Sequence, residues 1–213
     1  MNESLPLFDR PGGFEEIPMA DADVRLMPAL YRKPLSEQYL VRLLDEIAWR
    51  QEKIVLWGKE HMQPRLSAWY GDANSRYSYS GVALTPLPWT DTLTCIKEDI
   101  ERASGHRFNS VLLNLYRDEN DSVGWHSDAE PELGKMPVIA SLSLGATRTF
   151  RLRHRTRKDL KPVSIELSDG SLLLMAGTTQ RFWQHAVPKE RTACSRRINL
   201  TFRTILMSGQ GQH

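Results

Sequence analysis

The second half of the chain consists of short segments in which apolar and polar residues alternate, and this pattern limits the possible folds more than any other feature. From Phe108 onward, apolar side chains recur at every second position, as they do in β-strands. Further segments of this kind lie at 138–144, 147–152, 163–167, 171–175, 182–187 and 197–205. Glycine-containing turns separate several of them. Many short strands spaced by turns predict a sandwich, a barrel or a double-sheet jelly roll.

The first half of the chain has a different pattern, with helical spacing in two places. Residues 1–33 are polar and punctuated by proline and glycine, which indicates an irregular lead-in. Apolar residues at helical spacing predict one helix with Ser36 as its N-cap and a second helix that stops at Gly105. Short strands are expected at 24–27, 54–57 and 65–70.

Composition places the chain among ordinary globular proteins. Of its 213 residues, 40% are hydrophobic and 25% are charged, and the net charge of +2 indicates no strong preference for an acidic partner. Cys95 and Cys194 are isolated, so neither a disulfide framework nor a zinc ribbon is indicated. The sequence shows no signal peptide and no apolar run of membrane-spanning length. We therefore expect a cytoplasmic protein without a membrane partner.

His126 and Asp128 lie one residue apart, so in an extended stretch their side chains would project from the same face. Two histidines and one carboxylate on one side of a metal, with open positions opposite, are typical of non-haem Fe(II) oxygenases. Sequence spacing leaves the third ligand open, because a lone histidine is more often a structural residue than a ligand. The remaining candidates are His61, His106, His154, His185 and His213.

The late segment 197–203 has arginine, asparagine, threonine and arginine at its odd positions and apolar residues at its even ones. The usual interpretation is a strand with one face in the core and one face in water. The alternative is a polar cavity. Because arginine side chains fork onto carboxylates, two arginines converging from the ends of such a strand would suit a short dicarboxylate.

Two aromatic stretches precede the second helix. Trp57 would lie at a hairpin tip beside Gly58 and Lys59, either folded back onto the protein or exposed as an apolar wedge. Tyr77 and Tyr79 alternate with polar residues, which is typical of sheet-surface aromatics but also of a stacking wall. Both stretches therefore allow a structural and a nucleic-acid-binding interpretation.

Taken together, the motifs resemble one known family. The stretches that carry the resemblance are RLSAWYGDANSRYSYSG, FNSVLLNLYRDENDSVGWHSDAE, PVIASLSLGATRTFRLRHR and RRINLTFR. The combination of N-x-Y, H-x-D, a distal His and R-x-N-x-T-x-R in this order is specific, although each motif alone is not. Over roughly 64–205 the chain resembles the AlkB family of Fe(II)/2-oxoglutarate-dependent dioxygenases, and most of all the branch whose animal members repair duplex DNA.

The resemblance agrees with the strand pattern and implies a mainly β, α+β fold. Its core would be a double-stranded β-helix (jelly roll), with two supporting helices N-terminal to it. We expect a single catalytic domain over 1–213. Within it, the expected parts are an irregular lead-in at 1–33, helices and nucleotide-recognition hairpins at 34–107, and the jelly-roll core at 108–206.

The resemblance also implies roles for individual residues. The residues implied to bind Fe(II) are His126, Asp128 and His185. The residues implied to hold 2-oxoglutarate are Asn114, Tyr116, Arg197, Asn199, Thr201 and Arg203. The residues implied to contact the nucleotide are Trp57, Gly58, Lys59, Arg65, Tyr77, Ser78, Tyr79 and Glu130.

Within the co-substrate group, Arg197 and Tyr116 would take the distal carboxylate, and Arg203 and Asn114 would take the end that chelates iron. The implied reaction couples decarboxylation of 2-oxoglutarate by O2 to oxidative demethylation of 1-methyladenine and 3-methylcytosine in DNA. Its products are succinate, carbon dioxide, formaldehyde and the repaired base. The base must leave the duplex to be reached.

The sequence departs from this branch at three positions. Ala129 stands where the branch has an acidic residue, Tyr79 where it usually has phenylalanine, and Trp57 where it has a smaller aromatic. The base and strand preferences therefore stay open. We expect a monomer acting on alkylated DNA, single- or double-stranded, with RNA as a further partner.

Two other classes of function remain as alternatives. One is a 2-oxoglutarate-dependent hydroxylase or demethylase acting on RNA or protein. The other is a non-enzymatic jelly-roll module that binds nucleic acid through the basic run at 148–158, although such a run is most often a solvated hairpin.

Overall fold

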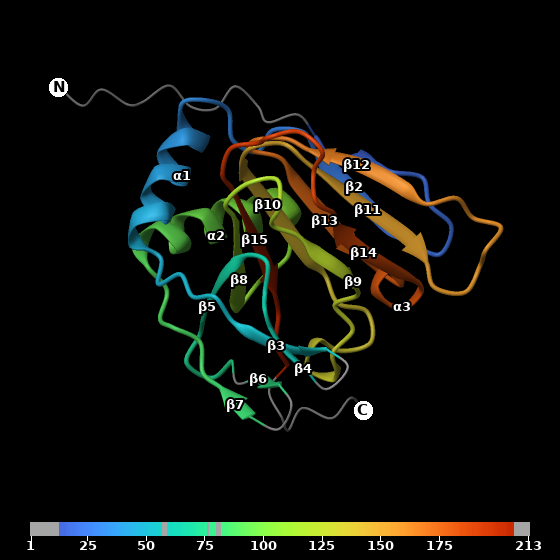
Figure 1. The fold of residues 1–213 in the computed structure, drawn as a ribbon, viewed down its shortest axis with the longest axis horizontal. Helices are drawn as coiled ribbons and strands as arrows, with labels where there is room; N and C mark the ends of the chain where they lie inside the picture. The colour runs from blue at the N-terminus through green and yellow to red at the C-terminus, as the bar shows by residue number, and fades with distance from the viewer. Residues whose placement is uncertain (1–12, 57–58, 76, 80–81, 207–213) are drawn as a thin grey trace.

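The computed structural model describes residues 13–56, 59–75, 77–79 and 82–206, and for 54–56, 59, 77–79 and 82–84 only the backbone is considered. Two antiparallel sheets form its centre (Figure 1). The seven-stranded sheet runs in the order β1 (Glu15–Glu16), β2 (Asp23–Met27), β13 (Leu172–Ala176), β10 (Ile139–Gly145), β15 (Arg197–Arg203), β8 (Ser110–Tyr116) and β5 (Leu66–Gly71). The four-stranded sheet runs β12 (Val163–Leu167), β11 (Arg148–His154), β14 (Trp183–Val187) and β9 (Val123–His126).

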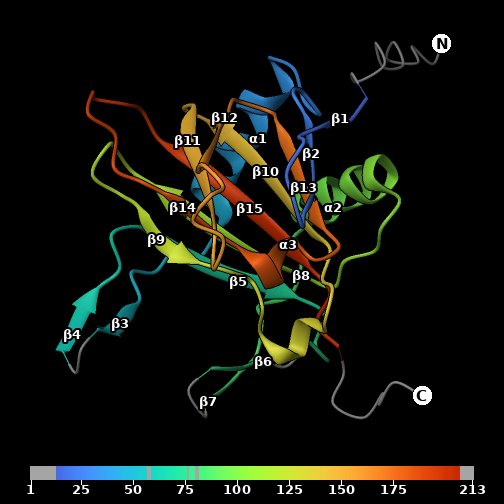
Figure 2. The same ribbon diagram turned by 90° about the vertical axis from the view of Figure 1, so that its right-hand side faces the viewer.

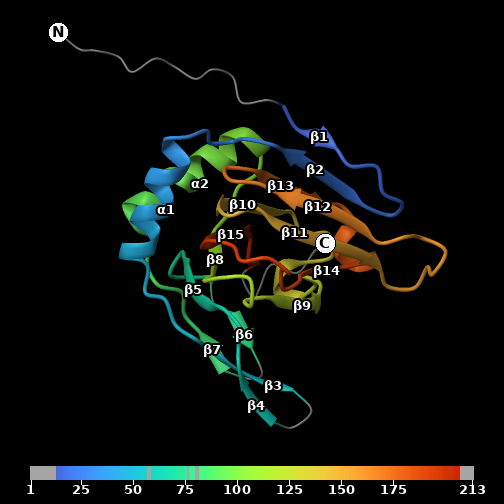
Figure 3. The ribbon, with the colours of Figure 1, turned by 45° about the horizontal axis from the view of Figure 1, so that its top comes forward.

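Two helices, α1 (Leu35–Glu46) and α2 (Asp91–Ser104), cover the face of the larger sheet that points away from β11 and β14 (Figure 3). Their apolar residues pack with the even-numbered side chains of β15, namely Ile198, Leu200 and Phe202. A second core lies between the sheets and joins Phe150 and Leu152 of β11 to residues of the larger sheet. The mainly β jelly-roll fold with two preceding helices is confirmed.

The helix ends show where local sequence decides the structure and where it does not. Thr90 caps α2 by accepting a hydrogen bond from the Leu93 backbone N–H at 3.2 Å, and Gly105 ends it in a left-handed conformation with φ 74°. The prediction of Ser36 as the N-cap of α1 was wrong. The helix begins at Leu35, and the buried Ser36 hydroxyl instead donates to Asp169 at 2.7 Å. A tertiary partner therefore outcompetes the local cap.

Two hairpins extend from the side of the jelly roll where β5 and β9 lie (Figure 2). One pairs β3 (Lys53–Leu56) with β4 (Lys59–Met62), and the other pairs β6 (Tyr77–Tyr79) with β7 (Val82–Leu84). Short helices complete the described elements: η1 (Pro131–Leu133), which follows the expected metal stretch, and α3 (Thr179–Phe182), which leads into β14. Among the described residues, no helix is both long and apolar enough to cross a membrane.

The basic run at 148–158 is not uniformly solvated, so the expectation of a solvated hairpin was wrong for part of it. Arg148 and His154 are 1% and 5% exposed, because alternate side chains of β11 point between the sheets. Arg151 and Arg153 point outward and are exposed. The run therefore combines one buried and one solvated face of a strand.

Candidate iron and co-substrate site

The two strands at the edge of the smaller sheet bring three metal-ligand side chains together. His126 ends β9 and lies opposite His185 of β14 in the strand register, with ring centroids 4.3 Å apart. Asp128 lies two residues past the end of β9, and the ligand atoms of the three residues all lie within 4.8 Å of one another. It is the one group of this kind found in the part of the chain that the structure describes.

The other described histidines are arranged differently. His154 lies between the sheets, where its Nδ1 accepts hydrogen bonds from the backbone N–H groups of Arg157 at 3.0 Å and Thr156 at 3.3 Å. Its ring also packs against Phe182 and Trp183. These contacts give His154 a structural role. His185 is therefore the histidine that completes the three-ligand group.

The protonation of the ligand set suits a divalent metal. Burial, reinforced by the neighbouring His126, lowers the pKa of His185 to about 3, so its imidazole is neutral at physiological pH. Burial alone would raise the pKa of Asp128, but Arg203 and the two histidines outweigh it and keep the pKa below its usual range. Metal ligands must be deprotonated to bind, and both groups meet that condition.

Neighbouring groups fix the orientation of these ligands. The Nδ1 atom of His126 lies 2.8 Å from the Gly124 carbonyl oxygen, which makes Nδ1 the protonated nitrogen and leaves Nε2 for a metal. Arg203 donates from Nη2 to Asp128 Oδ1 at 2.7 Å, and the Asp128 backbone N–H donates to Gln180 Oε1 at 3.0 Å. Two imidazoles and one held carboxylate match the ligand set of non-haem Fe(II) oxygenases.

The inner face of the larger sheet supplies the expected co-substrate residues. In the register of β8 and β15, Arg197 lies opposite Tyr116 and Asn199 lies opposite Asn114. All four are buried. The polar face of β15 is thus enclosed between the sheets rather than exposed to water. Of the two interpretations that the sequence allowed, the enclosed polar face is the one observed.

Arg197 has hydrogen-bonding capacity to spare. It is 1% exposed, its Nη2 donates to Ser143 Oγ at 2.9 Å, and its Nε and Nη1 have no partner among the described residues. Burial lowers its pKa, which reflects the cost of holding this charge away from water. A buried guanidinium with unused donors is stable only when an anion or another acceptor meets it. A carboxylate fits this requirement.

Arg203, at the other end of β15, also has a buried Nε without a partner among the described residues. Its Nη2 is already bonded to the metal ligand Asp128. Unused arginine donors thus lie at both ends of one strand, one of them beside the metal group. This spacing suits a dicarboxylate with one end at the metal.

Asn199 and Thr201 form a support rather than a set of free donors. The Asn199 amide donates to Ser141 Oγ at 2.7 Å and to the Leu142 carbonyl at 3.0 Å, and its Oδ1 accepts from Thr201 Oγ1 at 3.1 Å. Sequence reasoning missed Ser141 and Ser143, which accept hydrogen bonds from Asn199 and Arg197. Small polar residues at alternate positions of an otherwise apolar strand were the available signal.

Arg65 was expected to contact the nucleotide, and in the structure it is half-buried with its guanidinium bonded to the protein. Its Nε donates to Asn114 Oδ1 at 2.7 Å and its Nη1 to the Ser122 carbonyl at 3.3 Å. Burial lowers its pKa. Arg65 therefore links β8 to the loop before β9, and contact with a nucleotide stays a prediction.

Comparison with known proteins agrees with this geometry. Residues 23–203 match the 2OG-Fe(II) oxygenase superfamily, and the chain is 44% identical over 215 residues to alpha-ketoglutarate-dependent dioxygenase alkB homolog 3 of Rattus norvegicus, covering 96% of this chain and 72% of that protein. The chain belongs to the AlkB family of 2OG-Fe(II) oxygenases. It is thus an enzyme that uses Fe(II), 2-oxoglutarate and O2, as expected, and the non-enzymatic alternative is set aside.

A second group of relatives of this AlkB-family protein carries a more specific name. The chain is 40% identical over 188 residues to DNA oxidative demethylase ALKBH2 of Homo sapiens, covering 84% of this chain and 72% of that protein. A solved structure, that of OsALKBH1, aligns with a TM-score of 0.59 at 18% identity and covers 90% of this chain and 99% of that one. The solved structure supports the shared fold alone.

The substrate side of the site is described in part. Glu130 precedes η1, and its Oε2 is buried without a partner among the described residues. Trp57 and Gly58 lie outside the described residues, as do the side chains of Lys59, Tyr77, Ser78 and Tyr79. The predicted nucleotide contacts of these residues therefore stay predictions.

A hollow of about 550 Å³ lies beside the metal stretch. Its wall includes Ala129, the residue that follows Asp128. It also includes Gln180, whose Oε1 accepts a hydrogen bond from the Asp128 backbone N–H. Lys135, Arg155 and Arg181 also line it, and none of the described residues that line it is acidic. The described side chains that line this hollow therefore carry a net positive charge.

Proposed function

We propose that the protein oxidatively removes N-alkyl groups from bases such as 1-methyladenine and 3-methylcytosine in DNA, repairing alkylation damage directly. The observation that carries the proposal is the His126, Asp128 and His185 group beside Arg203, with the unsatisfied Arg197 at the other end of the same strand, in a chain similar to an oxidative DNA demethylase. The same similarity supports the remaining co-substrate roles of Asn114, Tyr116, Asn199, Thr201 and Arg203.

In this proposal His126, Asp128 and His185 would hold Fe(II), the metal that such a ligand set suits. The metal would activate O2, and O2 is the oxidant that converts 2-oxoglutarate to succinate and carbon dioxide and hydroxylates an N-methyl carbon. The resulting hemiaminal would release formaldehyde and the repaired base. Arg197 binds the distal carboxylate of 2-oxoglutarate with its free Nε and Nη1 donors. Arg203 anchors the other end while it holds Asp128 in place.

The choice of a nucleic-acid substrate has support from two charged features. The unpartnered Glu130 carboxylate oxygen is suited to a base with a fixed positive charge, as in 1-methyladenine and 3-methylcytosine. The hollow lined by Lys135, Arg155 and Arg181 is suited to the phosphates that flank the reacting nucleotide. A base inside a duplex must be flipped out to reach the metal.

The test is succinate release by the purified protein with Fe(II) and 2-oxoglutarate, with and without a methylated oligodeoxynucleotide. The matched control is the same oligonucleotide without the methyl group. We expect the methylated strand alone to stimulate succinate and formaldehyde release in equal amounts. Stimulation by methylated RNA or by a protein but not by methylated DNA would overturn the DNA assignment and favour the remaining alternative.

A further inference from the structure

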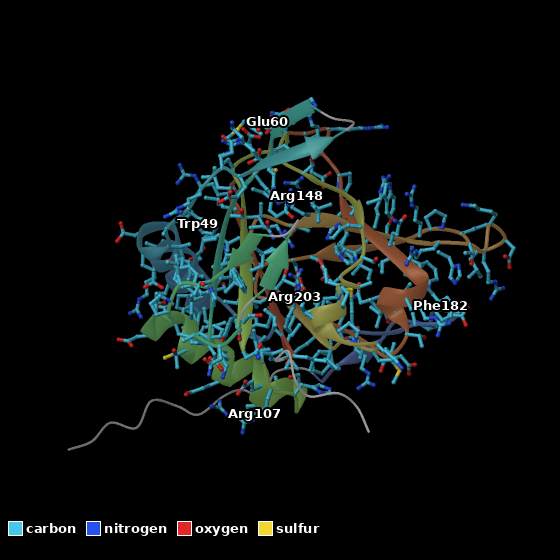
Figure 4. The ribbon with its side chains drawn as sticks, turned by 90° about the horizontal axis from the view of Figure 1, so that it is seen from below. Trp49, Glu60, Arg107, Arg148, Phe182 and Arg203 are labelled. Carbon is cyan, nitrogen blue, oxygen red and sulfur yellow. The ribbon has the colours of Figure 1, made fainter. Side chains whose placement is uncertain are left out.

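Arg148, the first residue of β11, is a second buried arginine that no proposed role accounts for. It is 1% exposed, and its guanidinium donates to three backbone carbonyls: those of Asp118 at 3.3 Å, Asp121 at 2.8 Å and Pro188 at 2.7 Å. In the view from below, Arg148 and Arg203 both lie towards the middle of the molecule, whereas Arg107 lies at its edge (Figure 4).

The three carbonyls belong to the segments that flank the metal-ligand strands. Asp118 and Asp121 lie in the loop that leads into β9, and Pro188 directly follows β14. The register of these strands shifts between the His185–His126 pair and the Val187–Val123 pair. Arg148 therefore ties the two strands together just beyond this irregularity.

Arg148 also shares an aromatic partner with Arg197. The two guanidinium carbons lie 5.2 Å and 5.1 Å from the centre of the same Tyr116 ring. Two buried arginines thus share one aromatic ring. Their proximity contributes, after burial, to the lowered pKa of Arg197.

Little negative charge balances these two cations. The carboxylate nearest to Arg148 is that of Glu190, whose Oε1 lies 3.5 Å from Arg148 Nε and whose side chain is 25% exposed. The Asp121 carboxylate lies nearby but is bonded to Arg117 at 2.8 Å. Among the described residues, the inner end of the co-substrate pocket therefore carries more positive than negative charge.

We propose that Arg148 is a specificity-determining residue, the second cation that selects a dicarboxylate 2-oxo acid over a monocarboxylate one. The inference rests on the proposed placing of 2-oxoglutarate beside Arg197. In this inference Arg148 does not bind the co-substrate directly: carbonyl groups occupy its Nη1 and Nη2 donors, and its Nε faces Glu190 Oε1 at 3.5 Å. It acts through its charge, which is weakly screened in the buried pocket, and through the position of Tyr116.

The experiment measures binding without turnover, using the protein loaded with Mn(II) under anaerobic conditions. Calorimetric titrations compare 2-oxoglutarate with 2-oxopentanoate, which has the same chain length but lacks the distal carboxylate. Weak binding of 2-oxopentanoate is measured by competition. The quantity of interest is the ratio of the two affinities in the wild type, Arg148→Met and Arg148→Lys.

We expect Arg148→Met to lower the 2-oxoglutarate affinity about tenfold and to leave the 2-oxopentanoate affinity unchanged. Arg148→Lys keeps the charge and should preserve most of the ratio. Arg151→Met is the matched control, because it removes a charge from the solvated face of the same strand. An unchanged ratio in a folded Arg148→Met protein would overturn the proposal, because a purely structural clamp weakens both ligands equally.

Two further variants keep the test decisive. Glu190→Gln removes the partial counter-charge and should tighten 2-oxoglutarate binding several-fold without changing 2-oxopentanoate binding. It serves where Arg148→Met does not fold, and an unchanged ratio in Glu190→Gln would then overturn the proposal. Arg197→Met tests the underlying assignment. If this variant leaves the affinity ratio unchanged, 2-oxoglutarate does not bind beside Arg197 as proposed. If the ratio changes in Arg197→Met but not in the Arg148 or Glu190 variants, only the inference about Arg148 is wrong.

Discussion

The two sheets contribute different chemistry to one site. The larger sheet presents hydrogen-bond donors on β8 and β15, two strands in continuous register from Arg197–Tyr116 to Arg203–Ser110. The smaller sheet presents metal ligands on β9 and β14, a pair with an irregular register. Regular strands suit an extended ligand that is held at both ends, whereas a metal needs three side chains to converge at one point.

The sheets also differ in how their polar groups are satisfied. On the larger sheet, Asn199 and Thr201 bond to each other and to β10, while Arg197 keeps unused donors. On the smaller sheet, every ligand has a contact that orients it, from Gly124, Arg203 or Phe150. The larger sheet therefore has unused donors available for a ligand, whereas the metal-ligand side chains of the smaller sheet are already oriented by their neighbours.

The largest effect is expected from removing a ligand on the smaller sheet. His126→Ala, Asp128→Ala and His185→Ala should each abolish turnover and weaken metal binding more than about 100-fold, because even groups that only support a ligand contribute up to that much. Metal content and activity are measured on protein whose circular dichroism matches the wild type. The control is His154→Ala, which removes a histidine from the same sheet and should lower the melting temperature while metal affinity persists. Full demethylation by folded His185→Ala would disprove the assignment.

The second effect concerns the larger sheet. Arg197→Ala should raise the 2-oxoglutarate concentration needed for half-maximal rate by about 100-fold, since it removes one side of a buried charge pair. The requirement for methylated oligonucleotide should stay unchanged, because Arg197 lies between the sheets. Initial rates are titrated against each substrate in turn. An unchanged 2-oxoglutarate requirement would mean that the polar face of β15 has another purpose.

These two regions also show how far sequence reasoning reached. The alternation along β15 predicted which residues share a polar face, because strand geometry is local. It could not decide whether that face meets water or a second sheet, since the cover comes from β11 and β14. The third metal ligand stayed open for the same reason, because only the pairing of β14 with β9 brings His185 to His126.

The burial of charges along β11 depends on the same packing. A basic run favours solvation on average, yet Arg148 and His154 lie inside because their positions face the larger sheet. The loss of Ser36 as a helix cap likewise comes from a partner distant in the sequence, Asp169. Local preferences are therefore overridden where strands and helices from distant parts of the chain meet.

A third prediction concerns the stability of the metal-free protein. The pKa of His185 is lowered to about 3 in the folded protein and is about 6.5 in an unfolded chain. As the pH falls below about 6.5, His185 therefore becomes protonated in the unfolded chain but stays neutral in the folded protein. His185 should lower the free energy of unfolding by about 1.4 kcal/mol per pH unit in this range, with its stabilisation fully present only above it.

Chemical denaturation of the metal-free protein between pH 7.5 and pH 4.5 measures this slope. Because other groups titrate over the same range, the comparison is with His185→Asn, whose stability should fall less steeply with decreasing pH. Parallel stability curves for the two proteins would contradict the prediction. Bound metal should not reduce this slope, since the metal-loaded folded protein also leaves His185 unprotonated while the unfolded chain still takes up the proton.

The smallest effect is expected at Glu130, which lies just outside both sheets and should affect the choice of base rather than the chemistry. Its buried, unpartnered Oε2 favours a cationic base, because a fixed positive charge replaces the missing partner. The wild type should therefore prefer 1-methyladenine and 3-methylcytosine to neutral O-alkylated bases, and Glu130→Gln should reduce that preference about fivefold, within the range for one charged hydrogen bond.

Rates are measured with oligonucleotides of identical sequence that differ in the lesion alone. Glu132→Gln, two positions along the chain, is the control and should leave the preference intact. Equal wild-type rates on cationic and neutral lesions would show that Glu130 does not select the base, and the specificity would then have to come from the hairpins that flank β5 and β9.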